Sequence, residues 1–363
     1  MKGRRGRCLV AAGAVIVLTA FIIVVASSCS GSGEVTTTSF PEASYPGLPG
    51  SDPGSSGSDS EPRPVDDKVW QAALALQVDL TAQKANQPAD VAVLDGTMFV
   101  TDTVNNRLLS VSADGKTVRV LDKTVDPKLV FDQPLAIASG QGLLYVADSH
   151  GGRVVVLQPS GAVTQVITLA KGSPTDAAQV RPIGIAVWND GSFAVSDGSN
   201  NRVLKYGPDG NMLWMLGTGK RDKGENGFST PSGLALDKDG NLYVVDILNG
   251  EVKKYSADGK FLSVLGQSGD TAGRFSRAKA VAVDDAGNVY VSDGLGVAIQ
   301  VFDQAGAYLG LVGRKEPSNP QSVSLFAAPH GVKIVNGKLY VVDRYAGLFV
   351  FDVPASTPTS TSS

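Results

Sequence analysis

The sequence predicts an all-β fold made of six repeated units, each with four short strands. An apolar run that ends in Asp recurs through the 363 residues, at Asp102, Asp148, Asp197, Asp246, Asp293 and Asp343. The copies lie 46 to 50 residues apart, which is a spacing typical of propellers and solenoids. The chain also contains 42 glycines and only 18% charged residues, and this composition suits many tight turns between strands.

The fourth unit shows the expected strands most clearly. Turn sequences KDG, LNG and ADG separate its four apolar runs, which are Ser232–Asp237, Asn241–Ile247, Glu251–Ser256 and Lys260–Gly266. No helical periodicity is present in this unit. Four strands at this spacing favour the blades of a propeller over a β-helix, because the coils of a β-helix are much shorter.

Two of the units carry a more specific resemblance. The segments PSGLALDKDGNLYVVDILNGEVKKYSADGKFLSVLG and PIGIAVWNDGSFAVSDGSNNRVLKYGPDGNMLWMLG resemble NHL repeats, and the joining loops GTGKRDKGENGFSTP and GQSGDTAGRFSRAKA have that family's Gly-rich run and Phe. The resemblance spans residues 87–353. It implies a six-bladed β-propeller similar to the extracytoplasmic sensor domains of some bacterial kinases, with blades starting near residues 87, 133, 181, 230, 277 and 328.

The last unit has sequence for three strands, so its fourth strand must come from elsewhere. Before the first unit, the apolar residues Leu74, Leu76, Val78 and Leu80 alternate with polar or small ones, which is the pattern of a half-buried strand. An unpaired third strand would leave an open sheet edge. We therefore expect residues 74–80 to close the ring as the outer strand of the last blade. The alternative is a short helix, because Ala and Gln are frequent in residues 70–83.

The N-terminus has the pattern of an export or anchor signal, which we assign to residues 1–29. Four basic residues precede residues 9–26, an uncharged run of 18 residues. A helix of that length is roughly 27 Å long, close to a hydrocarbon core of ~30 Å. The basic residues place the rest of the chain outside the cell membrane. Small residues before Cys29 resemble a bacterial lipobox, although Ala26 occupies the position where that pattern prefers Leu. Lipidation at Cys29, an uncleaved anchor and secretion remain the three alternatives.

Residues 30–65 and 354–363 flank the folded part, residues 66–353. Both flanking segments are rich in Ser and in Pro or Gly, so they cannot bury enough apolar surface to form a core. We expect a disordered linker that holds the domain away from the membrane, and a disordered tail.

Composition excludes several classes of function. The net charge of −3 argues against nucleic acid, which needs clustered Lys and Arg. The two cysteines, Cys8 and Cys29, both precede the folded part, and two histidines are too few for a three-His zinc site. No nucleophile elbow, phosphate-binding loop or EF-hand spacing is present. We therefore expect no metal, no cofactor and no catalytic residue, and a monomer that binds an unknown protein, peptide or cell-envelope ligand.

An acid and an arginine recur five residues apart in the first three units, at Asp102 and Arg107, Asp148 and Arg153, and Asp197 and Arg202. At the same spacing after Asp246, Asp293 and Asp343, the arginine is replaced by Glu251, Ala298 and Leu348. An enzyme needs a catalytic pair only once, whereas this pair occurs in three units and loses its arginine in the other three. We therefore interpret the Asp residues as turn anchors that accept backbone N–H groups, with the Arg tying the turn down.

Positions that differ between units are the better candidates for binding. His330 follows the strand-initiating Pro329 in the last unit, and to within one residue it aligns with Asp90, Ala136, Gly184, Gly233 and Ala280. This places it at the mouth of a central channel. Other candidates are Arg344 and Tyr345 after the sixth Asp, and the basic residues Lys220, Arg221 and Lys223 in the loop between the third and fourth blades.

These observations lead to two hypotheses of function. The first is an extracytoplasmic, membrane-anchored propeller that binds a ligand or a protein without catalysis. The alternative is a metal-dependent lyase or lactonase-like hydrolase at the channel mouth, with the metal held by carboxylates and His330.

Overall fold

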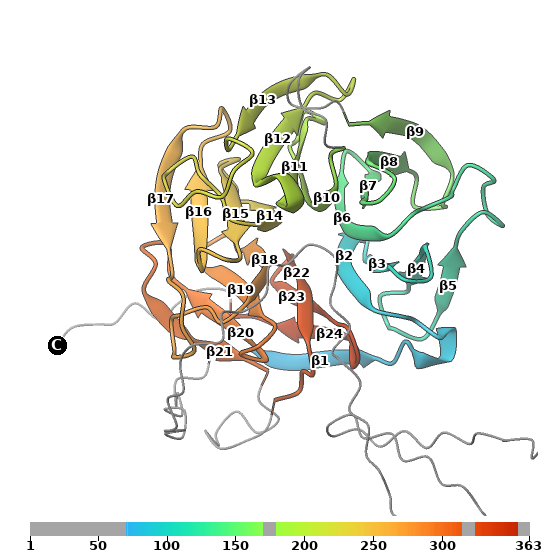
Figure 1. The fold of residues 1–363 in the computed structure, drawn as a ribbon. Coiled ribbons are helices and arrows are strands. Elements are labelled where there is room, and N and C mark those ends of the chain that lie inside the picture. The colour runs from blue at the N-terminus through green and yellow to red at the C-terminus, as the bar shows by residue number, and fades with distance from the viewer. Residues whose placement is uncertain (1–69, 71, 170–178, 314–323, 355–363) are drawn as a thin grey trace, which may run out of the picture. The chain divides into compact units, whose positions relative to one another are not determined.

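The computed structural model describes residues 70, 72–169, 179–313 and 324–354. These residues form six four-stranded antiparallel sheets arranged in a ring (Figure 1). The innermost strand of each sheet contacts the innermost strands of both neighbouring sheets. The predicted all-β, six-bladed propeller is therefore confirmed.

The strands of each blade are given from the innermost to the outermost. Blade 1 contains β2 (Pro88–Leu94), β3 (Thr97–Asp102), β4 (Arg107–Val111) and β5 (Val118–Leu121). Blade 2 contains β6 (Pro134–Gly140), β7 (Leu143–Asp148), β8 (Arg153–Leu157) and β9 (Val163–Thr168). Blade 3 contains β10 (Pro182–Val187), β11 (Phe193–Asp197), β12 (Arg202–Tyr206) and β13 (Met212–Leu216).

The second half of the ring follows the same order. Blade 4 contains β14 (Pro231–Leu236), β15 (Leu242–Asp246), β16 (Glu251–Tyr255) and β17 (Phe261–Leu265). Blade 5 contains β18 (Ala278–Val283), β19 (Val289–Asp293), β20 (Ala298–Phe302) and β21 (Tyr308–Val312). Blade 6 contains β22 (Pro329–Val335), β23 (Lys338–Asp343), β24 (Gly347–Asp352) and β1 (Ala73–Val78). Two short 3₁₀ helices complete the description, η1 (Thr81–Gln83) and η2 (Gly198–Asn200).

The ring closes through β1, which pairs antiparallel with β24 at the other end of the described chain (Figure 1). The predicted closing strand is confirmed, and the alternative of a helix is wrong. The strand ends at Val78 rather than Leu80, because the Asp79 carboxylate accepts a hydrogen bond from the Thr81 backbone N–H and starts η1. Leu80 remains buried in the core between blades 6 and 1.

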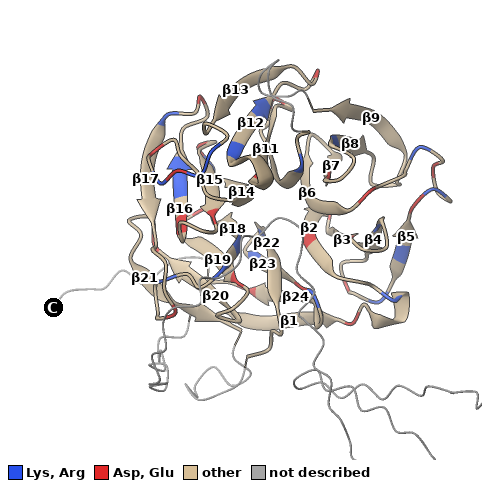
Figure 2. Ribbon diagram, viewed as in Figure 1, with Lys and Arg blue, Asp and Glu red and all other residues tan. Residues whose placement is uncertain are grey.

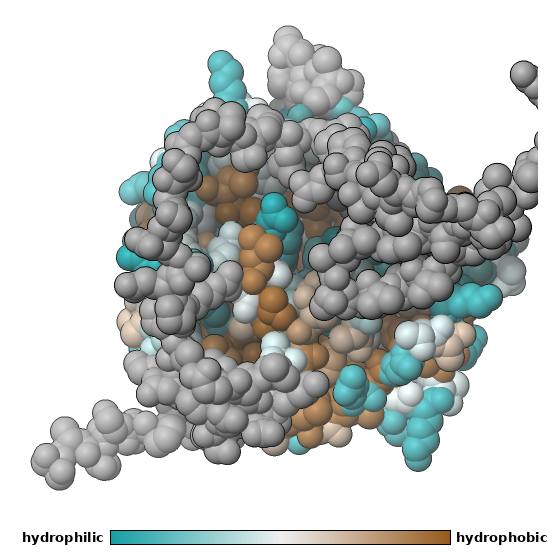
Figure 3. All heavy atoms as spheres, turned by 60° about the horizontal axis from the view of Figure 1, so that its bottom comes forward, coloured by the Kyte–Doolittle hydropathy of each residue, from teal (hydrophilic) through white to brown (hydrophobic). Residues whose placement is uncertain are grey.

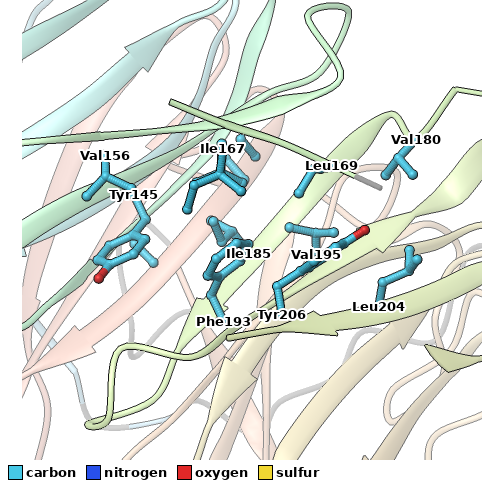
Figure 4. Packing of buried hydrophobic residues seen from close by; sticks show 14 residues of the cluster. Tyr145, Val156, Ile167, Leu169, Val180, Ile185, Phe193, Val195, Leu204 and Tyr206 are labelled. Atoms are coloured by element: carbon cyan, nitrogen blue, oxygen red, sulfur yellow. The ribbon is translucent and has the colours of Figure 1, made fainter. Parts of the chain in front are cut away.

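Apolar side chains fill the space between neighbouring blades. Between blades 2 and 3, Tyr145, Val156 and Ile167 from one sheet face Ile185, Phe193, Val195 and Leu204 from the next (Figure 4). The rings of Phe193 and Tyr206 stack with their centroids 5.4 Å apart. Each blade buries both faces in this way, which explains why its second and third strands are almost continuously apolar. Figure 3 shows that some apolar surface also remains exposed between hydrophilic side chains on the side that it displays.

Within the described residues, no helix is long and apolar enough to cross a membrane. The apolar run of residues 9–26, Cys29 and the linker at 30–65 lie outside the described residues, as do residues 355–363 of the tail.

Candidate functional site

The repeated Asp residues share one place in the blade. Each is the last residue of the second strand and pairs with the first residue of the innermost strand, as Asp102 does with Pro88 and Asp343 with Pro329. All six are buried. Their carboxylates accept backbone N–H groups from the segment that leads into the innermost strand, such as Asn86 N at 2.7 Å for Asp102. The carboxylates therefore hold the start of each innermost strand in place.

In the first three blades an arginine completes this contact. The Nε atoms of Arg107, Arg153 and Arg202 lie 2.7, 2.7 and 3.0 Å from the carboxylates of Asp102, Asp148 and Asp197. Each arginine therefore pairs with the Asp of its own blade. This geometry gives both side chains a structural role, and neither is available as an acid or base for a ligand.

The other three blades satisfy the Asp differently. In blade 4 the buried Lys253 places its Nζ 3.4 Å from Asp246 and donates to the Gly224 and Gly227 carbonyls. In blades 5 and 6 additional backbone N–H groups of the following turn bind Asp293 and Asp343. Lys253 was missed from the sequence, because it lies seven residues after its Asp rather than five.

The innermost strands surround a small cavity of about 20 Å³, which we call the channel mouth. The strand register sets Pro329 opposite Asp343 as it sets Pro88 opposite Asp102. His330 is therefore equivalent to Ala89, one residue before the Asp90 with which the sequence aligned it. The second residues of the innermost strands are Ala89, Leu135, Ile183, Ser232, Lys279 and His330, and all line this cavity. Its walls thus differ, because blades 2 and 3 contribute apolar side chains and blades 5 and 6 contribute basic ones.

Charged residues are rare on the innermost strands. Figure 2 shows them in β2, β18 and β22, while β6, β10 and β14 carry none. The three residues concerned are Asp90, Lys279 and Lys333. Both Asp90 oxygens accept backbone hydrogen bonds, from Val91 at 2.9 Å and from Ile137 of blade 2 at 3.0 Å. Asp90 therefore links blades 1 and 2 through its carboxylate.

His330 is held between a carbonyl and a cation. Its Nδ1 lies 2.8 Å from the Ala89 carbonyl oxygen, and its Nε2 lies 3.0 Å from Nη2 of Arg344. A carbonyl only accepts and a guanidinium only donates, so Nδ1 carries the proton and the lone pair of Nε2 accepts the hydrogen bond from Arg344. Burial lowers the pKa of His330 well below its usual value of 6.5, and the charges of Arg344 and Lys279 act in the same direction. The imidazole is therefore neutral at pH 7.

Lys279 stands on the neighbouring blade and lines the same cavity. Its pKa is lowered to about 8, mainly by burial and also by the charges of Arg277 and Arg344, while the charge of Asp293 acts in the opposite direction. A lysine with a pKa near 8 is charged at pH 7 and neutral at moderately alkaline pH. Lys279 was missed from the sequence. The signal that marks it is a basic residue where four of the other five blades have Ala, Leu, Ile or Ser.

The remaining candidates lie apart from the channel mouth. Tyr345 is 72% exposed, and its backbone N–H donates to Asp343. Lys220, Arg221 and Lys223 are exposed on the segment between blades 3 and 4, where Lys223 lies 3.5 Å from Glu251. None of these four residues lines the cavity. The structure therefore places His330 in contact with Arg344. The loop that carries Lys220, Arg221 and Lys223 does not contribute to this cavity.

Comparison with protein families gives a match over residues 95–327, to the family described as "SMP-30/Gluconolactonase/LRE-like region". This range is more than half of the 363 residues. The chain belongs to the SMP-30/gluconolactonase-like family. A comparison with curated proteins finds no match.

Solved structures resemble this member of the SMP-30/gluconolactonase-like family in fold. A gluconolactonase from Xanthomonas campestris has a TM-score of 0.54 and 19% identity, with 79% of this chain and 98% of that chain covered. Virginiamycin B lyase from Staphylococcus aureus has a TM-score of 0.52 and 13% identity, with 77% of this chain and 98% of that chain covered. A Bacteroides thetaiotaomicron protein of unknown function has a TM-score of 0.57 and 17% identity, with 78% and 74% covered.

Membership of the SMP-30/gluconolactonase-like family corrects the first functional hypothesis. A propeller that only binds a ligand or protein is wrong as the main interpretation, because the family takes its description from an enzyme, gluconolactonase. The sequence argued against catalysis because it contains neither a known catalytic motif nor a repeated metal-binding set. Neither pattern reveals a cluster that combines Lys279 of blade 5 with His330 and Arg344 of blade 6.

The residues at the channel mouth do not fit the metal that the alternative hypothesis requires. Within residues 70–354, as far as they are described, no group of three or more His, Cys, Asp or Glu side chains is placed to hold a metal ion. The cavity is lined by one carboxylate, Asp90, and one imidazole, His330, and both are already hydrogen-bonded. Lys279 and Arg344 add positive charge beside them, which opposes the binding of a cation.

Proposed function

We propose that this protein is a lactonase-like hydrolase whose reaction takes place at the channel mouth and uses Lys279, His330 and Arg344 in place of a metal. The observation that carries the proposal is the neutral His330, whose Nε2 lone pair lies beside two cations. Membership of the SMP-30/gluconolactonase-like family supports a lactone as the substrate class.

The first step assigned to these residues is activation of water. Opening a lactone requires water to lose a proton as it attacks the ester carbonyl, and a neutral imidazole is the commonest side chain for this task. The Ala89 carbonyl, which accepts the Nδ1 proton, orients the ring and keeps Nε2 available as the base. Arg344 occupies Nε2 in the free protein, so it must turn toward the substrate before His330 takes the proton.

The second task is to stabilise the negative charge that develops on the carbonyl oxygen. Donors fixed around such an oxyanion are worth about 10²–10³-fold in rate for each donor removed. Arg344 and the protonated Lys279 supply this positive charge. When the tetrahedral intermediate collapses, the ring C–O bond breaks, and the imidazolium of His330 returns its proton to the alkoxide. The product is the open hydroxy acid.

The test measures hydrolysis of a panel of five- and six-membered lactones by the full-length protein. Proton release reports the reaction. We expect turnover that persists after treatment with a chelator and is lost in His330→Ala. Failure to open any lactone, or activity that returns only with added divalent metal, would contradict the proposal. An unsaturated product without water uptake would instead assign the lyase alternative.

We further propose that the enzyme works outside the cell, anchored by its N-terminus, and that its blades are of the NHL type. The anchor is supported by the four basic residues, the apolar run of residues 9–26 and the small residues before Cys29. The NHL type is supported by the motifs of the third and fourth blades. Mass spectrometry of the mature N-terminus tests the anchor, since a diacylglyceryl group on Cys29 indicates a lipoprotein and an intact Met1 indicates a transmembrane anchor. A free N-terminus after residue 26 indicates secretion.

A further inference from the structure

A second and larger cavity lies at the opposite ends of the innermost strands. Its volume is about 170 Å³, and it is lined by residues near the ends of these strands, among them Val93, Ser139, Val187, Leu236 and Val283. We call it the distal cup. The channel mouth is lined mainly by the second to fourth residues of the same strands, and Leu234 and Lys333 line both cavities. The two cavities therefore follow one another along the channel.

The size of the distal cup follows from one position in the repeat. The fifth residue of the innermost strand is alanine in five blades and lysine in blade 6, the six being Ala92, Ala138, Ala186, Ala235, Ala282 and Lys333, and all of them line the cup. Alanine has the smallest side chain that an ordinary strand position can carry, so a ring of alanines leaves space where larger residues would fill the channel. The single exception places one long cation in an apolar ring.

Lys333 is the only ionisable residue that lines the cup. Within the described residues, the Nζ atom of Lys333 forms no ion pair and no hydrogen bond. The acid that its charge influences is Asp90, and both Asp90 oxygens already accept backbone N–H groups. The other polar group in the wall, the Ser139 hydroxyl, donates to the Val93 carbonyl.

An ammonium group that has no anionic partner in the protein can form a charge-assisted hydrogen bond with an anion that enters the cup. We propose that the distal cup binds a small aliphatic carboxylate, with the carboxylate on Lys333 and the hydrocarbon chain among the alanine, valine and leucine side chains. An apolar cavity of roughly 150 Å³ holds a molecule the size of benzene, so the cup accommodates a chain of about four to six carbons. The site adjoins the channel mouth at Lys333 and Leu234, but it uses none of Lys279, His330 and Arg344 and does not depend on the proposed lactonase reaction.

The experiment is a calorimetric titration of the full-length protein with hexanoate, hexan-1-ol and hexylamine. We expect saturable binding of hexanoate, and binding of the alcohol and the amine at least roughly tenfold weaker, because a hydrogen bond to a charged group contributes about 1.5–3 kcal/mol. Lys333→Ala installs the residue of the five equivalent positions, so the fold is retained and hexanoate binding falls by the same factor. Ala235→Leu fills the cup on the side of blade 4 and weakens binding while Lys333 remains.

Arg344→Gln is the control for the channel mouth, because hexanoate could also approach the basic residues there. We expect Arg344→Gln to bind hexanoate as the wild type does. The proposal is overturned if hexanoate does not bind, if hexan-1-ol binds equally well, or if Arg344→Gln loses binding while Lys333→Ala keeps it. Thermal melting of each variant shows whether a loss of binding reflects the missing site or an unfolded protein. A folded Lys333→Ala variant that still binds hexanoate also overturns the proposal.

Discussion

The guanidinium of Arg344 lies 3.0 Å from the Nε2 atom of His330, although the two residues belong to different segments of blade 6. Arg344 follows β23, and His330 is the second residue of β22. Because a guanidinium cannot accept a hydrogen bond, this contact identifies Nε2 as the unprotonated nitrogen. It therefore defines where a proton can be taken and which cation must move when a substrate arrives.

Replacement of His330 tests the proposed base. We expect His330→Ala to lower kcat/KM for lactone opening by about 10²–10⁴-fold, the usual contribution of a general base. The matched control is His150→Ala. His150 is exposed on the turn of blade 2, with its Nδ1 3.7 Å from Asp132, and its removal should leave kcat/KM within about twofold of wild type. An equal loss in both variants would contradict the assignment.

The pH dependence tests His330 and Lys279 together. The pKa of His330 lies well below 6.5, so the base stays unprotonated and activity persists at pH 6.5. The pKa of Lys279 is about 8, so its charge is lost and activity falls as the pH rises through 8. Since Arg277 contributes to lowering the pKa of Lys279, we expect Arg277→Gln to move the alkaline limb of kcat/KM to higher pH. Lys220→Gln, on the loop between blades 3 and 4, should leave the limb in place.

Lys279 should cost stability at neutral pH. Its folded-state pKa of about 8 lies below the ordinary value of 10.5, so below pH 8 both states bind the proton and the folded state bears the cost of the buried charge. Between pH 8 and 10.5 only the unfolded chain keeps the proton, and the folded state gains relative stability as the pH rises. We expect Lys279→Met to raise Tm at pH 7, where about 1 kcal/mol corresponds to roughly 2–4 °C in a domain of this size. The advantage should shrink from pH 8 to 10.

The control for this prediction is Lys338→Met. Lys338 is exposed and pairs with Asp352, and this hydrogen bond raises its pKa rather than lowering it. Its replacement should not raise Tm at pH 7. A Lys279→Met variant that melts at or below the wild-type temperature would show that the buried ammonium is compensated in the folded state.

The ring closure can be tested with two leucines near the N-terminal strand. Leu80 is 2% exposed in the core between blades 6 and 1, whereas Leu74 on β1 is 44% exposed. We expect Leu80→Ala to lower the free energy of unfolding by about 2–5 kcal/mol and Leu74→Ala to change it by no more than about 0.5 kcal/mol. Chemical denaturation measures both. Equal effects would mean that Leu80 does not hold the blade interface.

Lys253 should be required for the stability of blade 4. Its buried Nζ contacts Asp246 and two backbone carbonyls, and removal of one partner from a buried ion pair costs about 3–5 kcal/mol. We therefore expect Lys253→Met to lower the free energy of unfolding by this amount, measured by denaturant titration. Lys260→Met, on the exposed turn of the same blade, should be close to neutral.

Most of the fold could be predicted because each blade repeats a local pattern. The Asp-terminated strands, the Gly turns and the alternating residues before the first blade each reflect a local requirement of strand or turn. The closing strand could be predicted as well, since three strands in the last unit leave an edge that only an alternating apolar segment can cover.

The candidate site could be predicted only in part. His330 and Arg344 were identifiable because they differ from the equivalent residues of the other blades, but their contact was not. The alignment of blades left His330 uncertain by one residue, and only the pairing of Pro329 with Asp343 set it beside Ala89. Lys253 and Lys279 escaped notice because no spacing rule connects them to their partners.

The sequence by itself determined the number of blades, their strands and the closure of the ring, since these follow from short-range periodicity and from the need to pair every sheet edge. The tertiary structure alone decided the chemistry of the channel. It brings Lys279 of blade 5 beside His330 and Arg344 of blade 6 and shields the imidazole and the ammonium group from much of the surrounding water. That desolvation, and not any motif, makes the imidazole neutral and the lysine easy to deprotonate.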